Sequence, residues 1–295
     1  METVTEIISF SHGGSRRLWH PFSAKFGPCC NVICSESMHQ SVDLVDTFQM
    51  MFTTNNHNPE LLEQRNSRMV RRLLFGNNPM KVECSVSFKT EGNEYVLRRC
   101  LIESHSVEIK INKVGTNIVY SENDAISVLE KLHKPRSCNT GPLMKREGTI
   151  FKPFNDHSRK TLSILANNWV KKIGFGGSRF DIDYDGRWSV ITKQDNSKPR
   201  RQLLATKIQM NSFLLLISNL AQAVMKKRTY GRSSPYFFAF NSNLLTLDET
   251  LSVVDLVKKV CNEENIQVIL AMNATPELAS MINGIQCPPT SLYND

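Results

Sequence analysis

Residues 31–46 read NVICSESMHQSVDLVD, a stretch that joins an apolar segment to an amphipathic one without a glycine or a lysine. The segment CCNVIC (29–34) is typical of a short buried strand. The segment after it has the helical period, with one apolar face formed by Val42, Val45, Phe48, Met51 and Phe52. A phosphate-binding loop would be expected between such a strand and helix, yet the residue types that grip phosphate are missing.

The composition is that of a globular chain with a real core: 295 residues, 40% hydrophobic and 22% charged. The net charge of +8 favours an acidic partner, with nucleic acid as the first candidate. A basic surface without a binding role explains the same excess of positive charge equally well. The opening METVTEIISF has acids where a secretory signal needs bases, so we expect reduced thiols in the nucleus or cytosol. Cys29, Cys30 and Cys34 cluster without the partners of a zinc site, and no metal is predicted.

The remaining periodicity predicts an α/β layer with an antiparallel annex. Alternating residues in 81–89, 94–102 and 106–114 indicate a β meander, and the apolar segments 234–240 and 266–272 indicate buried strands. Two short strands are expected around the Asp185-Gly186 turn. Helices are expected over 41–52, 58–75, 121–132, 159–173, 202–226 and 248–264. The run Ile208–Met225 is interrupted by polar residues, which favours a buried helix over a membrane span.

This order of elements resembles the ATPase head of structural maintenance of chromosomes (SMC) proteins and their relatives in the ABC class, a two-lobed P-loop NTPase fold. Residues 31–46 fit the family pattern N-x-I-x-G-x-N-G-x-G-K-S-x-x-x-D without a gap, with matches at Asn31, Ile33 and Asp46. The functional positions of this Walker A loop depart from the pattern. Glycines are replaced by Ser35, Met38 and Gln40, the lysine by Ser41, and the magnesium-binding hydroxyl by Val42.

The second half resembles the family in the same partial way. SPYFFAFNSN (234–243) is similar to the start of a Walker B strand, but Phe240 and Asn241 stand where the family has its Asp–Glu pair. Leu247 and Asp248 resemble the D-loop, and Asn273 stands at the switch histidine. The signature Leu-Ser-Gly-Gly-Glu is absent.

The resemblance implies a division into four parts. These are an N-terminal lobe with the meander (1–132), a connector in place of the family's coiled coil (133–157), a C-terminal lobe (158–280) and a loose tail (281–295), with both lobes in one domain.

The replaced motif residues lead us to predict a pseudo-ATPase: not an enzyme, without a cofactor and with no catalytic residues. The expected role is a scaffold in a nuclear chromosome-associated complex, serving genome maintenance, repair, meiosis, telomeres or silencing. A protein partner or a second copy of the chain would bind to the head surface, with DNA as a further partner and no membrane.

Two alternatives stay open from the sequence. One is a nucleic-acid-binding protein without enzymatic activity, whose basic candidates are Arg65, Arg68, Arg71, Arg72, Lys198, Arg200, Arg201, Lys226, Lys227 and Arg228. The other is an unrelated enzyme. Its only hints are the alternating Asp181, Asp183 and Asp185, which are better read as a solvated strand face, and the glycine cluster 174–177, which is usually a turn.

Overall fold

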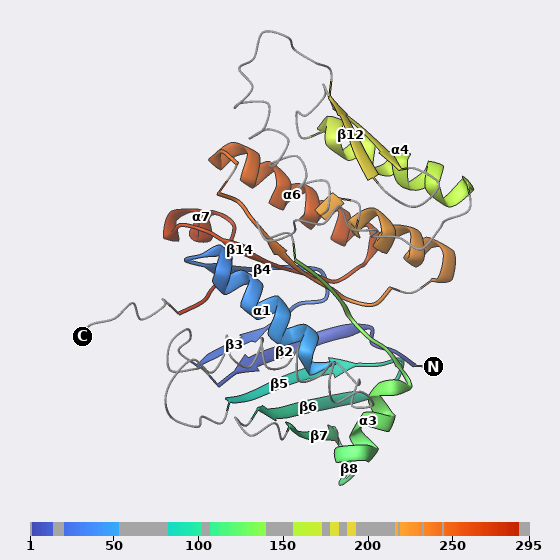
Figure 1. Ribbon diagram of the computed structural model, residues 1–295, viewed down its shortest axis with the longest axis vertical. Coiled ribbons are helices and arrows are strands. Elements are labelled where there is room, and N and C mark those ends of the chain that lie inside the picture. The colour runs from blue at the N-terminus through green and yellow to red at the C-terminus, as the bar shows by residue number, and fades with distance from the viewer. Residues whose placement is uncertain are drawn as a thin grey trace, which may run out of the picture.

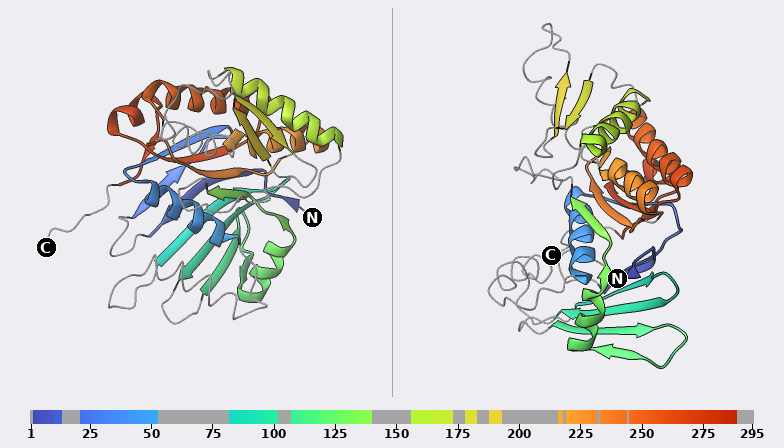
Figure 2. Two further views of the ribbon diagram at one scale, coloured as in Figure 1. Left: turned by 45° about the horizontal axis from the view of Figure 1, so that its top comes forward. Right: turned by 90° about the vertical axis from the view of Figure 1, so that its right-hand side faces the viewer.

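The computed structural model has three layers, in which a parallel sheet lies between a group of helices and an antiparallel sheet, with helix α1 (Met38–Met51) between the two sheets (Figures 1 and 2). The structure describes residues 2–13, 21–52, 82–101, 107–139, 156–172, 178–182, 188–192, 216–217, 219–231, 233–243 and 245–288.

The antiparallel sheet has six strands in the order β3-β2-β5-β6-β7-β8. Its inner face follows from alternation: Cys84, Val86 and Phe88 are buried, while Glu83 and Ser85 lie on the outer face. Helix α3 (Glu122–Glu130) packs on the inner face through its apolar residues. The strands are β2 (Glu6–His12), β3 (Phe22–Lys25), β5 (Val82–Lys89), β6 (Glu94–Leu101), β7 (Val107–Lys113) and β8 (Val119–Ser121).

The parallel sheet has five strands in the order β10-β13-β14-β4-β15. Strand β4, from the N-terminal part of the chain, lies between two strands from the C-terminal part, so both parts share one sheet. Both faces of the sheet are covered, which explains the continuous apolar runs in its strands. The strands are β4 (Cys30–Ser35), β10 (Arg136–Asn139), β13 (Tyr236–Phe240), β14 (Val268–Asn273) and β15 (Ile285–Gln286).

Helix α1 builds the core that joins the two sheets. Its Phe48 is 1% exposed, and its ring centroid lies 4.6 Å from that of Phe237 on β13 and 6.1 Å from that of Phe10 on β2. Phe52 lies 5.4 Å from Phe48 and 5.5 Å from Phe88 on β5. Aromatic packing therefore runs without a break from the parallel sheet to the antiparallel sheet.

The opposite face of the parallel sheet is covered by α4 (Asp156–Lys172), a helix that includes residues 219–230, and α6 (Leu247–Glu264), with α7 (Pro276–Met281) beyond them (Figure 1). Helix α6 begins where the sequence T-x-x-E predicts. Thr246 Oγ1 accepts from the Glu249 amide at 3.2 Å, and Glu249 Oε2 accepts from the Thr246 amide at 2.8 Å. The helix ends at Asn265, whose positive φ of 50° turns the chain into β14.

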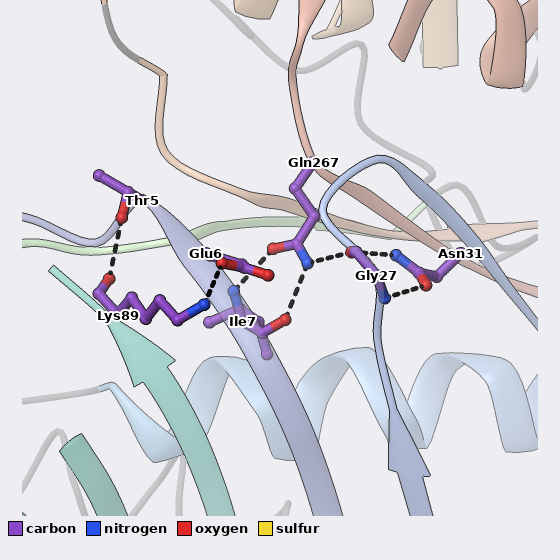
Figure 3. A network of polar contacts seen from close by, with 7 residues as sticks. All are labelled: Thr5, Glu6, Ile7, Gly27, Asn31, Lys89 and Gln267. Atoms are coloured by element: carbon purple, nitrogen blue, oxygen red, sulfur yellow. Dashed lines mark hydrogen bonds and ion pairs between the residues drawn. The ribbon is translucent and has the colours of Figure 1, made fainter. Parts of the chain in front are cut away.

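A buried glutamine ties the start of β14 to the antiparallel sheet (Figure 3). Gln267 Oε1 accepts from the Ile7 amide at 2.7 Å, and Gln267 Nε2 donates to the carbonyl oxygens of Ile7 at 2.8 Å and Gly27 at 2.7 Å. Asn31, which matches the family pattern, holds the same turn: it accepts from the Gly27 amide at 2.8 Å and donates to the Gly27 carbonyl at 2.9 Å. Side-chain amides thus satisfy backbone groups at the junction of the two sheets.

The structure confirms the α/β class, the meander and the buried strands, and it adds short strands in two segments where none was predicted. Residues inside the predicted connector form the end of β9 (Leu132–His133) and all of β10; β9 pairs with β1 (Glu2–Thr3). The predicted loose tail, moreover, contains β15, which pairs with β4. Strands of two to four residues are too short to show an alternating pattern in the sequence. They form because they pair with neighbouring strands. The hairpin of β11 (Ser178–Ile182) and β12 (Trp188–Thr192) forms as predicted.

Several predictions fall on residues outside the described ranges. These are the helix over 58–75, the connector from 140 to 155 and the beginning of the helix over 202–226. Among the helices that the structure describes, none has the length and apolar content to cross a membrane. The division into lobes, connector and tail stays a prediction.

Burial of His12 at the end of β2 makes stability depend on pH. His12 is 2% exposed, and burial lowers its pKa from 6.5 to about 4. The unfolded chain therefore binds a proton between these values that the folded chain does not, so the stability present above pH 6.5 is lost as the pH falls. Between these two pKa values, His12 should cost the wild type on the order of 1 kcal/mol of unfolding free energy for each pH unit that the pH falls. We expect this loss to be absent from His12→Gln.

The measurement is the free energy of urea unfolding of both proteins across this pH range. His133→Gln is the matched control, because His133 is exposed, and it should keep the slope of the wild type. Parallel pH curves for the wild type and His12→Gln would contradict the prediction.

Candidate functional site

The candidate site lies at the carboxyl ends of three adjacent parallel strands, where ligands bind in open α/β sheets. Strand β4 ends at Ser35 and β14 at Asn273, and these two residues are in register. Asn241 directly follows β13, whose last residue Phe240 pairs with Met272. Polar residues therefore lie at the carboxyl ends of the buried strands, along one edge of the sheet.

The loop between β4 and α1 is held by hydroxyl groups. Ser35 Oγ lies 2.7 Å from Ser41 Oγ and 2.9 Å from the Ser37 carbonyl oxygen. The Gln40 amide donates to Ser37 Oγ at 3.3 Å, the bond expected of a helix N-cap. Ser35 and Ser41 are 2% and 0% exposed. Two of the predicted Walker A positions are therefore directly bonded to each other.

Gln40 connects this loop to the C-terminal segment. Its Oε1 accepts from the Glu36 amide at 3.1 Å, and its Nε2 donates to the Pro288 carbonyl at 3.0 Å. Beside it, the Cys287 amide donates to the Cys34 carbonyl at 2.8 Å. The segment after β15 therefore runs along the end of β4, next to the candidate site.

Asparagines form the second half of the site. Asn273 Oδ1 accepts from the Ser242 amide at 3.1 Å, and Asn273 Nδ2 donates to Asn243 Oδ1. Asn241 Oδ1 accepts from the Asn243 amide at 3.1 Å, and Ser242 Oγ donates to the Asn273 carbonyl. The residue at the switch position thus orders the loop that follows the Walker B position.

The other predicted positions belong to the core instead. Met38 and Val42 are 7% and 6% exposed and belong to the apolar cluster that lies between the two sheets, while Phe240 packs with the outer helices. The buried polar residues of the site, Ser35, Gln40, Ser41, Asn241, Ser242 and Asn273, are all uncharged. They offer neutral hydrogen-bond donors and acceptors.

Sequence reasoning missed Ser242, Asn243 and the Pro288 carbonyl. The only signal for Ser242 and Asn243 was their place after an apolar strand, and nothing in the sequence brings Pro288 to Gln40.

Most of the predicted basic residues cannot be placed. Arg65, Arg68, Arg71, Arg72, Lys198, Arg200 and Arg201 lie outside the described residues, as do Asp183 and Asp185. Lys226 and Lys227 are half-buried on the helix that includes 219–230. Arg228 is engaged with Glu264 on α6: its Nε donates to Glu264 Oε2 at 3.1 Å, and this hydrogen bond raises the pKa of Arg228. In the described part of the chain, no group of histidine, cysteine and acidic side chains could hold a metal ion.

Close packing at Gly284 fixes the C-terminal segment beside the site. A Cβ on Gly284 would lie 2.3 Å from Cys34 Sγ, and the Gly284 amide donates to the Ala279 carbonyl at 2.9 Å. We expect Gly284→Ala to lower the free energy of unfolding by about 1–3 kcal/mol, because Cys34 is buried and has little room to move.

Urea unfolding gives the stability, and amide hydrogen exchange at 284–287 should rise in the variant. Gly92→Ala is the control, since nothing lies within 4 Å of its Cβ and the substitution should be neutral. A Gly284→Ala protein as stable as Gly92→Ala would contradict this packing.

Comparison with known proteins gives a clear result for structure and none for sequence. No protein-family model matches the chain, and a search of the curated proteins finds no match. An SMC head bound to the C-terminal winged-helix domain of ScpA superposes with a TM-score of 0.57 at 12% identity, covering 93% of this chain and 91% of that chain.

The chain has the fold of an SMC head domain.

Two further SMC heads agree. The head with an extended coiled coil bound to the C-terminal domain of ScpA, from Pyrococcus furiosus, gives a TM-score of 0.56 at 10% identity, covering 94% of this chain and 91% of that chain. The head from Thermotoga maritima gives 0.50 at 10% identity, covering 94% and 92%. The SMC-head fold that the order of elements predicts is therefore confirmed over nearly the whole chain.

The same comparison corrects the prediction of a pseudo-ATPase that is not an enzyme. The neighbours are SMC heads, and SMC heads are ATPase heads, so the fold points to an ATPase family. Nothing in the described residues shows that this SMC-head-like chain is inactive. The prediction relied on replaced motif residues alone, and a list of replaced side chains does not measure turnover.

Proposed function

We propose that this chain is a protein-interaction head that works as a scaffold within a nuclear chromosome-associated complex. The observation that carries the proposal is the SMC-head fold over more than nine-tenths of the chain. Two of the compared heads were solved with a ScpA domain bound. By analogy, the partner of this chain is a small winged-helix domain or a second copy of the head.

Exposed apolar side chains support contact with a protein. Val114, Ile118 and Val119, at the turn between β7 and β8, are 45%, 44% and 58% exposed. Leu247 and Met281, at the ends of α6 and α7, are 51% and 57% exposed. Apolar surface of this kind is often covered in an assembly.

The test is affinity purification of the tagged chain from its own cells after cross-linking, followed by reconstitution with each captured protein. Light scattering should give a mass well above the 33.6 kDa of one chain, either alone or with a chromosomal partner, and should be recorded with and without magnesium-ATP. Fluorescence imaging should place the tagged chain in the nucleus. A monomer under every condition, or a chain excluded from the nucleus, would refute the proposal.

A second candidate function, nucleic-acid binding, is favoured by a row of side chains across the outer face of the antiparallel sheet. Strand register aligns one residue from each of the six strands. The row consists of Ser23, Ser11, Ser85, Arg98, Lys110 and Ser121, and none of these is buried. At the usual spacing between strands it extends about 24 Å.

Two features of the row point to an anion. A cavity of about 380 Å³ is lined by Ser11, Ser85, Arg98 and Lys110, with Glu83 and Glu108 also on its wall. Arg98 and Lys110 stand directly opposite each other, so two cations lie together on the outer face, with the carboxylates of Glu83 and Glu108 beside them. A phosphate backbone lying over the row would meet cations and hydroxyl donors.

We expect the double substitution Arg98→Glu and Lys110→Glu to weaken duplex DNA binding about tenfold or more and to flatten its dependence on salt. Fluorescence anisotropy over a salt series measures both. Lys131→Glu with Lys160→Glu changes the net charge equally at exposed positions and should have a smaller effect. Equal losses of DNA affinity in the two double variants would show that net charge, and not this row of residues, determines binding. Absence of DNA binding at low salt would rule out this function.

A further inference from the structure

The cavity on the outer face of the antiparallel sheet carries two neighbouring rows of opposite charge. In one row, strand register places Arg98 opposite Lys110. Two residues further along the same strands, register places Cys100 between Glu83 and Glu108. Side chains two residues apart on a strand are about 7 Å apart, so the carboxylates lie at about that distance along the strands from the cations. All four charged side chains line the same cavity of about 380 Å³.

The two rows offer opposite kinds of hydrogen-bonding group. The four charged side chains are exposed, so a ligand can reach them. In the cation row, Ser11 Oγ lies 2.7 Å from Ser85 Oγ; one hydroxyl donates in this bond, and the other keeps its hydrogen for a ligand. The cation row therefore presents donors, whereas ionised carboxylates in the other row can only accept.

A ligand that matches this cavity needs an anionic group and, about 7 Å from it, a hydrogen-bond donor. The sugar–phosphate backbone of DNA supplies the anion but has no donor, so the carboxylates can only repel it. The backbone of RNA has a 2′-hydroxyl on every sugar, which can donate to a carboxylate. Acidic side chains recognise ribose hydroxyls in the same way in dinucleotide-binding sites.

We propose that the cavity takes one nucleotide of single-stranded RNA, with its phosphate at Arg98 and Lys110 and its ribose 2′-hydroxyl at Glu83 or Glu108. This inference rests on the second candidate function, nucleic-acid binding, and names RNA as the ligand. A volume of about 380 Å³ lies at the lower end of the range for small-ligand cavities, which suits one nucleotide and not the two strands of a duplex.

The surroundings of the cavity favour a chain over a small zwitterion such as a free amino acid, which also carries both charges. The cation row continues beyond the cavity in both directions, to Ser23 on β3 and to Ser121 on β8. These are the two edge strands of the sheet. Hydroxyl groups along the row can donate to further phosphates of a strand that crosses the sheet.

The experiment measures fluorescence anisotropy of the full chain at low salt with three single-stranded oligonucleotides of one unstructured sequence: RNA, DNA and 2′-O-methyl RNA. RNA should bind about tenfold more tightly than either of the others, because only RNA has a donor for the carboxylates. The 2′-O-methyl form keeps the oxygen on the ribose and removes only its hydrogen, so it isolates the proposed hydrogen bond.

The double substitution Glu83→Ala and Glu108→Ala should abolish the preference for RNA, since RNA loses its acceptors and DNA escapes the repulsion. Both residues are exposed, so the core stays intact, and circular dichroism checks the fold of the variant. Glu263→Ala with Glu277→Ala is the matched control. It removes the same charge from exposed positions on α6 and α7 and should keep the preference.

The outcomes separate this inference from the function on which it rests. Equal affinity for the three oligonucleotides would overturn the inference and leave nucleic-acid binding in place. A preference for RNA that persists in Glu83→Ala with Glu108→Ala would also overturn it, because the carboxylates would then not be the groups that recognise the ribose. Failure of all three oligonucleotides to bind would overturn both.

Discussion

Replacing Phe48 with alanine should lower the free energy of unfolding by about 3–5 kcal/mol, a large fraction of the stability of a typical domain. Phe48 is 1% exposed and contacts the rings of Phe237, Phe52 and Phe10 with centroid distances of 4.6, 5.4 and 6.1 Å. The variant loses the transfer free energy of the ring and leaves a cavity between two sheets that cannot collapse onto each other. Urea unfolding followed by circular dichroism measures the loss.

Tyr230→Ala is the control for Phe48→Ala, because it removes an aromatic ring that is 71% exposed at the end of its helix. Its effect should stay within about 0.5 kcal/mol. If Phe48→Ala were as mild as Tyr230→Ala, α1 could not be the element that holds the two sheets together.

Replacing Gln267 with leucine should cost about 3–5 kcal/mol through a different mechanism. The substitution keeps the side-chain volume similar, but it leaves the amide and carbonyl of Ile7 and the carbonyl of Gly27 without hydrogen-bond partners. In the wild type, Gln267 forms hydrogen bonds of 2.7–2.8 Å with these three groups. Each buried backbone group left without a partner costs about 1–3 kcal/mol. Figure 3 shows that this one side chain reaches both β2 and the turn before β4.

Gln286→Leu makes the same chemical change at an exposed position on β15 and should leave stability nearly unchanged. Hydrogen exchange adds a local measure: the Ile7 amide should lose protection in Gln267→Leu and keep it in Gln286→Leu. Retained protection at Ile7 would show that water or the backbone replaces Gln267, and the predicted loss would then be wrong.

The order of elements could be predicted because each long element carries its own signal. The alternation Cys84, Val86, Phe88 specifies a strand, and the Thr246–Glu249 capping box marks the start of α6. This order was enough to predict the SMC-head fold although only 10–12% of residues are identical in the compared heads. The same signals fail for β9, β10 and β15, because strands of two to four residues exist only through their partners.

The motif frame predicted where a site lies but not what its residues do. Ser35 and Ser41 were identified from the frame, and the structure bonds them to each other. Met38 and Val42 came from the same frame and are core residues. The inference of lost activity from these replacements was wrong, because the comparison with SMC heads points to an ATPase family and the structure shows no inactivity in the residues it describes.

The sequence by itself determined the layers of this protein, since hydrophobic period and capping residues act over a few neighbouring positions and need no partner from elsewhere in the chain. Only the tertiary structure decided the contacts between distant segments: Gln267 with Ile7, Gln40 with Pro288, and the alignment of Arg98 with Lys110. Register and chain crossing set these contacts, and a one-residue slip would remove each of them while leaving every local pattern intact.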